Sequence, residues 1–108
     1  MGVTAQILND ALQAYVHTYP SRERLLAHIA DAGLTGHGDE IAAQLDAVLK
    51  TAEDHLYGYP GGVPWDAAFE RDYPALLLRQ HPWLDPESLG RIRGFSGWLC
   101  WHEGLNAK

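Results

Sequence analysis

Hydrophobic residues recur at three- and four-residue spacing through the first half of the chain, which is the pattern of amphipathic helices. The first such stretch runs from about residue 4 to residue 19 and ends at Pro20. A second stretch follows Ser21, a favourable N-cap, and ends at Gly33, which suits the left-handed position just past a helix. The pattern therefore predicts two helices joined by a short turn.

The clearest helical stripe follows a predicted loop at residues 35–38, and Asp39 is placed to cap this third helix. The apolar positions on its face are Ile41, Leu45, Val48, Leu49, Ala52 and Leu56. Its other face is acidic and carries Glu40, Asp46, Glu53 and Asp54 against Lys50. We interpret this acidic face as solvated, with a basic partner as the alternative.

The pattern changes after Tyr57, where proline and glycine become frequent. Residues 58–64 combine glycines with prolines that lack an N–H donor, so we expect a loop. Two short helices are predicted next, over residues 65–72 and residues 74–79, with Pro74 at the first position of the second one. His81-Pro82 ends that helix, because the residue before proline avoids the α region.

The last predicted helix begins at Asp85-Pro86-Glu87, which combines a capping side chain with proline at the first position, and it ends at Gly104. Helical rotation places four residues on one narrow face: Gly90, Gly94, Gly97 and Trp101. Most other directions are apolar, which predicts a buried central helix with a glycine groove for a neighbouring backbone, Trp65 or Trp83. The alternative to one continuous helix is a break at residues 94–97.

These elements predict an all-α fold, a single domain of five or six helices. Residues 1–57 form amphipathic helices, residues 58–88 form loops and short helices, and residues 86–104 form the buried C-terminal helix. With 108 residues, of which 46% are hydrophobic and 20% charged, the chain has the composition of a domain that folds alone.

Charge and cysteine content limit the partners and the cellular compartment that we expect for the protein. The formal net charge of −6 argues against binding to nucleic acid or to an anionic membrane. No segment approaches the length of apolar sequence that a membrane helix needs. The single cysteine, Cys100, excludes an internal disulfide, so we expect a soluble, cytoplasmic protein.

Candidate chemistry is sparse despite six histidines. Their spacings contain no His-x-x-x-His or Glu-x-x-His pair, so no metal site is predicted. Cys100 and His102 lie about 200° apart around a helix and cannot act together, and the cysteine is interpreted as a packing residue. We predict no catalytic residue and no cofactor.

Nine of the eleven aromatic residues lie between Tyr57 and Trp101. The rings of Phe95, Trp98 and Trp101 are interpreted as parts of the buried helix, whereas Tyr59, Trp65 and Trp83 lie on or beside loops, where binding residues are often displayed. Arg91 and Arg93 lie among apolar groups and need a carboxylate, an aromatic face or a ligand. The nearest carboxylate candidates are Asp66, Glu70 and Asp72.

Two hypotheses follow. The first is a small acidic, non-enzymatic protein that binds another protein, as an inhibitor, adaptor or immunity-type protein, through the loop aromatics or the acidic helix face; the oligomeric state stays open. The alternative is a small-molecule-binding or catalytic pocket with Arg91 and His102 as its polar groups. Its aromatic walls would be Trp65, Trp83, Trp98 and Trp101.

Overall fold

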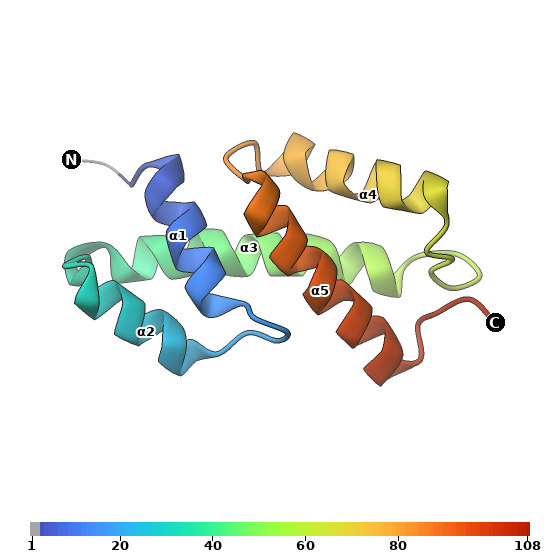
Figure 1. Cartoon of the computed structure of the whole chain (residues 1–108), viewed down its shortest axis with the longest axis horizontal. Coiled ribbons are helices and arrows are strands. Elements are labelled where there is room, and N and C mark those ends of the chain that lie inside the picture. Colours follow the sequence, from blue (N-terminus) through green and yellow to red (C-terminus); the bar gives the residue numbers. More distant parts are fainter. Residues whose placement is uncertain (1–2) are drawn as a thin grey trace.

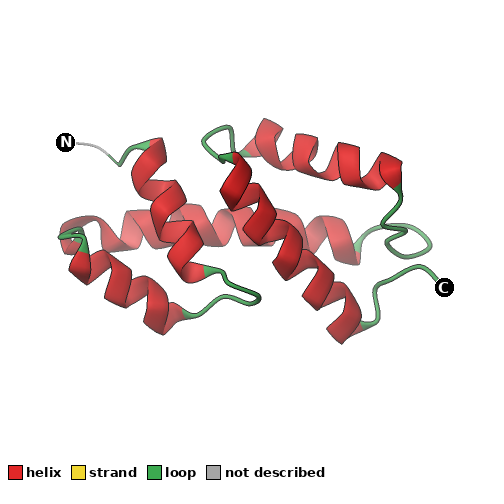
Figure 2. Ribbon diagram, in the orientation of Figure 1, coloured by secondary structure: helices red, strands yellow, loops and turns green. Residues whose placement is uncertain are grey.

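The computed structural model describes residues 3–108 and confirms the all-α class. Five α-helices follow one another, with a single 3-10 turn at Thr35–His37 and no strand in the described residues (Figure 2). The helices are α1 Ala5–Tyr15, α2 Arg22–Asp31, α3 Gly38–Tyr57, α4 Ala67–Gln80 and α5 Pro86–Glu103.

The longest helix, α3, organises the others. In Figure 1 it runs along the length of the molecule, and α1 and α5 cross over the same side of it. Helix α2 lies beside α1, and α4 packs along the C-terminal half of α3. The described chain measures 46 × 25 × 19 Å, so it consists of two helical layers and no third layer covers α5.

The apolar stripe predicted for α3 is confirmed, because all six of its residues are buried. Helices α1 and α5 add further buried side chains to the same core: Leu8, Leu12, Tyr15, Ile92, Phe95 and Leu99. The opposite face of α3 is exposed at Glu40, Asp46 and Asp54. One amphipathic helix therefore supplies the base on which the core is assembled.

Four helices begin at a capping side chain that accepts a hydrogen bond from a backbone N–H three residues later. These caps are Thr4, Ser21, Asp66 and Asp85. The prediction for α3 is wrong, because Asp39 lies inside its first turn and no side chain caps it. The 3-10 turn leads directly into α3 at Gly38, so the chain is already helical before Asp39.

Helix α1 is shorter than predicted and ends at Tyr15. Residues 16–20 form a tight turn closed by a bridge between Val16 and Pro20. Arg24 of α2 stabilises this arrangement, because its guanidinium donates to the carbonyls of Ala14, Tyr15 and Tyr19 at 3.2, 3.3 and 2.9 Å. These bonds satisfy carbonyls that a continued helix would have paired.

The prediction of two short helices after the loop is wrong, since α4 is continuous through Pro74. Pro74 has no N–H to donate to the carbonyl of Glu70, a loss that usually breaks a helix. However, Phe69, Tyr73 and Leu77 recur every four residues on one face and all three are buried. Their packing holds the helix together across the proline.

Residues 58–64 form a loop as predicted, and the C-terminal tail pairs with it. Val63 donates to the carbonyl of Leu105 at 2.8 Å, and Ala107 donates to the carbonyl of Val63 at 2.9 Å. Gly62 has a φ of 88°, and a Cβ there would lie 2.9 Å from Ala107. Only glycine fits this close approach.

Helix α5 begins at the Asp85 cap, runs unbroken through residues 94–97 and ends at Gly104, as predicted. It is buried along the side that carries Ile92, Phe95 and Leu99. The expectation that the glycine face is also covered is wrong. Gly90 and Gly94 are exposed, a Cβ at either would meet no atom within 4 Å, and Trp101 is 73% exposed.

A buried asparagine connects α1 to the start of α5. Asn9 donates to the carbonyls of Ala5 and Trp83 at 3.0 and 2.7 Å, and its oxygen accepts from the N–H of Asp85 and the hydroxyl of Ser88 at 3.0 and 2.7 Å. All four of its hydrogen-bonding positions are used. Asn9 therefore sets where α5 begins relative to α1.

We expect Asn9→Ala to lower the free energy of unfolding by about 3 kcal/mol, because the carbonyl of Trp83, the N–H of Asp85 and the hydroxyl of Ser88 each lose their hydrogen bond to Asn9. Urea denaturation followed by tryptophan fluorescence measures this loss. Gln6→Ala is the matched control, since Gln6 bonds only to exposed Asp10, and its effect should stay within about 0.5 kcal/mol. Equal losses in the two variants would contradict the role of Asn9.

Candidate functional site

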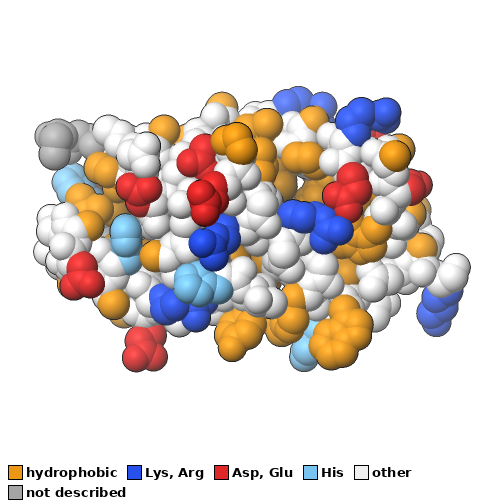
Figure 3. Space-filling model, in the orientation of Figure 1, with side chains coloured by type: hydrophobic (Ala, Val, Ile, Leu, Met, Phe, Trp, Pro, Cys, Tyr) orange, Lys and Arg blue, Asp and Glu red, His pale blue; other side chains and the backbone are white. Residues whose placement is uncertain are grey.

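The most exposed aromatic side chains gather where the α1–α2 turn meets the C-terminal end of α5. Trp101 is 73% exposed and Tyr19 is 53% exposed. The ring of Trp98 lies 5.6 Å from that of Tyr19 and stacks on His102 at 5.0 Å. We call Tyr19, Trp98, Trp101 and His102 the aromatic surface. In Figure 3, hydrophobic side chains protrude at the lower edge of the molecule, where these segments end.

Tyr57, at the end of α3, connects this region to the base of the fold. Its hydroxyl donates to the carboxylate of Glu103 at 2.8 Å, and this hydrogen bond raises the pKa of Tyr57. The carboxylate of Glu103 also lies 3.6 Å from His102. An acidic group therefore borders the aromatic surface, and the last turn of α5 is tied to α3.

The loop-borne rings predicted as binding candidates, Tyr59, Trp65 and Trp83, are half-buried against the core. Tyr59 packs edge-on against Phe69 at 5.3 Å. The indole N–H of Trp83 is buried and has no acceptor among residues 3–108. A role for these rings in binding stays a prediction, but they do not protrude as Trp101 does.

Trp65 holds the loop and the C-terminal tail together. It has a φ of 50°, a left-handed conformation that is uncommon for a bulky residue. Its indole N–H donates to Asn106 at 2.7 Å, and its ring packs edge-on against Phe69 at 4.9 Å. These contacts hold the unusual backbone in place.

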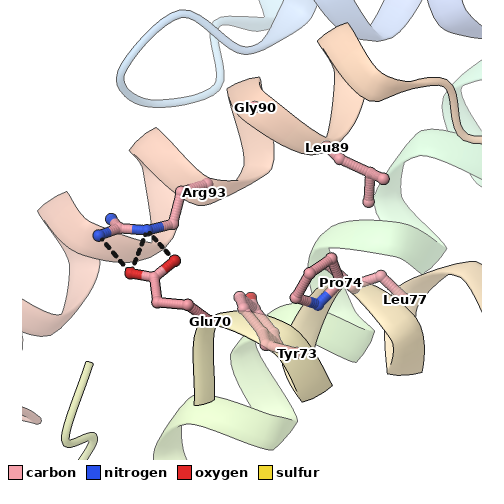
Figure 4. Close-up of a pocket in the computed structure, with 7 residues that line it drawn as sticks. All are labelled: Glu70, Tyr73, Pro74, Leu77, Leu89, Gly90 and Arg93. Atoms are coloured by element: carbon pink, nitrogen blue, oxygen red, sulfur yellow. Dashed lines mark hydrogen bonds and ion pairs between the residues drawn. The ribbon is translucent and has the colours of Figure 1, made fainter. Parts of the chain in front are cut away.

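Arg93 has the carboxylate partner that the sequence predicted. Its guanidinium donates to both carboxylate oxygens of Glu70, with the shortest distance 2.8 Å, and lies 4.0 Å over the ring of Trp65 (Figure 4). Arg91 has a weaker contact, 3.8 Å from Glu87. Helical rotation places Arg91 and Arg93 on opposite edges of the exposed side of α5. Each of them lies beside a carboxylate.

A cavity of about 190 Å³ opens between α4 and α5. The close-up in Figure 4 shows the Arg93–Glu70 pair at one end and apolar side chains at the other. Its lining residues are Glu70, Tyr73, Pro74, Leu77, Leu89, Gly90 and Arg93. Neither Arg91 nor His102 lines this cavity, so it differs from the pocket that the sequence suggested.

The titratable groups of the interior are held in their neutral forms. His55 stacks on Tyr73 at 5.4 Å, and burial lowers the pKa of His55. Burial likewise lowers the pKa of His81, whose ring nitrogen lies 2.8 Å from the hydroxyl of Thr51. Burial raises the pKa of the Cys100 thiol, which keeps it protonated and unreactive at neutral pH.

Among residues 3–108 no three His, Cys, Asp or Glu side chains lie close enough together to hold a metal ion. No helix in the same range is both long and apolar enough to cross a bilayer. The fold and its surfaces therefore define a five-helix protein with an exposed aromatic surface and a small interhelical cavity.

No protein-family model matches the chain, and neither the curated proteins nor the solved structures contain a match to it.

Stability should fall as the pH drops below about 6.5, the pKa of an unperturbed histidine. Because burial lowers the folded-state pKa of His55 and His81, the unfolded chain takes up protons first as the pH falls. Each histidine contributes at most about 1.4 kcal/mol per pH unit until the pH passes its folded pKa. Urea denaturation between pH 8 and pH 5 measures the slope.

The variant His55→Phe should flatten this slope, because it keeps a ring against Tyr73 and removes the titrating group. His17→Gln, which removes an exposed histidine of the α1–α2 turn, is the control. An equal flattening in both variants would show that the buried ring is not the source of the pH dependence.

Proposed function

We propose that this chain is a small acidic, non-enzymatic protein that binds another protein through the aromatic surface. The observation that carries the proposal is Trp101, which is 73% exposed on a well-packed helix, three residues after Trp98, whose ring lies 5.6 Å from that of Tyr19. Tryptophan and tyrosine are the usual anchors of protein interfaces. An inhibitor, adaptor or immunity-type protein of the cytoplasm fits these properties.

The energy available at this surface supports the proposal. A tryptophan side chain buries about 150 to 250 Å² when it is fully enclosed, and roughly 25 cal/mol is gained per Å² of apolar area. Covering the exposed part of Trp101 is therefore worth about 3 kcal/mol. Trp98 lies three residues earlier on the same helix and packs on Tyr19, so these rings extend the surface beside Trp101.

The acidic face of α3 supports binding less well than the aromatic surface does. Asp46 already accepts hydrogen bonds from Tyr15 at 3.0 Å and Arg22 at 3.1 Å. Asp54 pairs with Lys50 at 3.3 Å. These two acids are therefore already engaged inside the chain.

The alternative function, a small-molecule or catalytic pocket around Arg91 and His102, has less support. Arg91 lies beside Glu87, and His102 stacks on Trp98 at 5.0 Å, so both side chains have neighbours within α5. The cavity between α4 and α5 is lined by Arg93 instead.

The test is an affinity capture from the native host with the wild type, Trp101→Ala, and the control Leu26→Ala. Leu26 is 58% exposed on α2, so its removal deletes a comparable apolar group elsewhere. We expect a protein that the wild type and the control retain and the Trp101 variant loses, with binding weakened by at least about 2 kcal/mol.

Calorimetry with the purified partner then measures the loss of affinity, and thermal unfolding verifies that each variant is folded. Retention of the same protein by the Trp101 variant at unchanged affinity would refute binding through the aromatic surface.

A further inference from the structure

The exposed face of α5 has a symmetry that its sequence spacing creates. Gly90, Gly94, Gly97 and Trp101 lie along this face, and the midpoint between Gly94 and Gly97 is also the midpoint between Gly90 and Trp101. Reversing the direction of the helix therefore exchanges Gly94 with Gly97 and Gly90 with Trp101. Trp101 and Gly90, which would receive its ring, therefore lie about 8 Å on either side of this midpoint along the helix axis.

We propose that the partner of this face is a second copy of the chain, bound through α5 in an antiparallel, two-fold arrangement. The inference rests on the proposed function, because it names the occupant of the surface that carries Trp101. In this dimer the Trp101 ring of each copy packs on Gly90 of the other and against the cavity beside it. Two-fold interfaces require this reciprocity, in which each side supplies both halves of the contact.

The cavity gives the incoming ring a place to pack. It opens beside Gly90, and its walls include the apolar side chains of Pro74, Leu77 and Leu89 (Figure 4). Its volume of about 190 Å³ suits a single large side chain rather than a peptide segment. Trp101 itself lies too far along α5 to fill this cavity in its own chain, so a second molecule has to supply the ring.

The centre of the face is open enough for two helices to cross closely. A Cβ at Gly90 or Gly94 would meet no atom within 4 Å, so nothing in the chain itself occupies the space above them. At Gly97 only the far end of the Arg93 side chain comes near. Helices with small residues at the crossing point can approach to the short end of the usual 8 to 10 Å range.

Charge on α5 does not oppose a second copy, although the whole chain is acidic. Helix α5 carries two acids and two arginines, Glu87 and Glu103 against Arg91 and Arg93, so it has no net charge while the chain has −6. Antiparallel pairing also sets the positive N-terminal end of each helix beside the negative C-terminal end of the other.

A stable dimer needs only a modest share of the surface of this chain. A typical stable interface buries about 800 Å² on each partner. That is about 13% of the 6102 Å² accessible surface of the chain.

Sedimentation equilibrium from about 1 µM to about 1 mM tests the inference on the full chain. The wild type should change from monomer to dimer within this range. Trp101→Ala should weaken the dimer about thirtyfold. Gly94→Leu should abolish it, because the new side chain blocks the helix crossing while Trp101 remains in place.

Gly94→Leu also separates loss of the interface from loss of the fold. Because the position is open and leucine favours helix, its unfolding temperature should equal or exceed that of the wild type. Ala30→Leu, at an exposed position of α2, is the matched control and should dimerise like the wild type. A dimer that survives Gly94→Leu unchanged would overturn the inference.

A wild type that stays monomeric up to about 1 mM would also overturn it. The proposed function is tested by a different experiment, the affinity capture. It stands if the wild type captures another protein that the Trp101→Ala variant loses, and it fails otherwise. A monomeric wild type that captures such a protein therefore removes the second copy as partner and leaves the proposed function intact.

Discussion

Burial of the apolar stripe of α3 is the constraint on which the rest of the structure depends. Its residues, from Ile41 to Leu56, are all almost fully covered, and α1, α4 and α5 each pack on this one helix. Helix α2 also packs on α1, but no helix lies over α5 on the side away from α3. The outer side of α5 faces solvent for that reason, and the exposure of Trp101 follows from the two-layer architecture.

The contacts at the two ends of α5 make that outer side a rigid surface. At its start, Asn9 accepts from the hydroxyl of Ser88 at 2.7 Å, and at its end Tyr57 donates to Glu103 at 2.8 Å. The N–H of Leu105 adds a bond to the carbonyl of Cys100. A surface fixed in this way loses little conformational entropy when a partner covers it, which favours affinity.

Local sequence rules predicted the elements but not which of their faces are covered. Periodicity identified the α3 stripe, and helical rotation correctly grouped Gly90 with Trp101. However, rotation does not say whether a neighbour lies on that face, so the same grouping led to a wrong prediction of burial. At Pro74 the helix-breaking rule failed because the packing of Phe69 and Tyr73, which is a tertiary effect, outweighed it. The Arg93–Glu70 pair was predictable because a partly buried arginine needs a carboxylate.

Some glycines of the chain are required by the backbone conformation, and others are not. Gly62 and Gly104 are explained by backbone conformation, since both have positive φ and Gly62 lies against the C-terminal tail. Gly90 and Gly94 are helical and exposed, and a Cβ at either would meet no atom within 4 Å, yet each costs roughly 1 kcal/mol relative to alanine. The open space above them leaves room for another helix to approach the bare backbone, and this connects the two positions to the exposed ring of Trp101 on the same face.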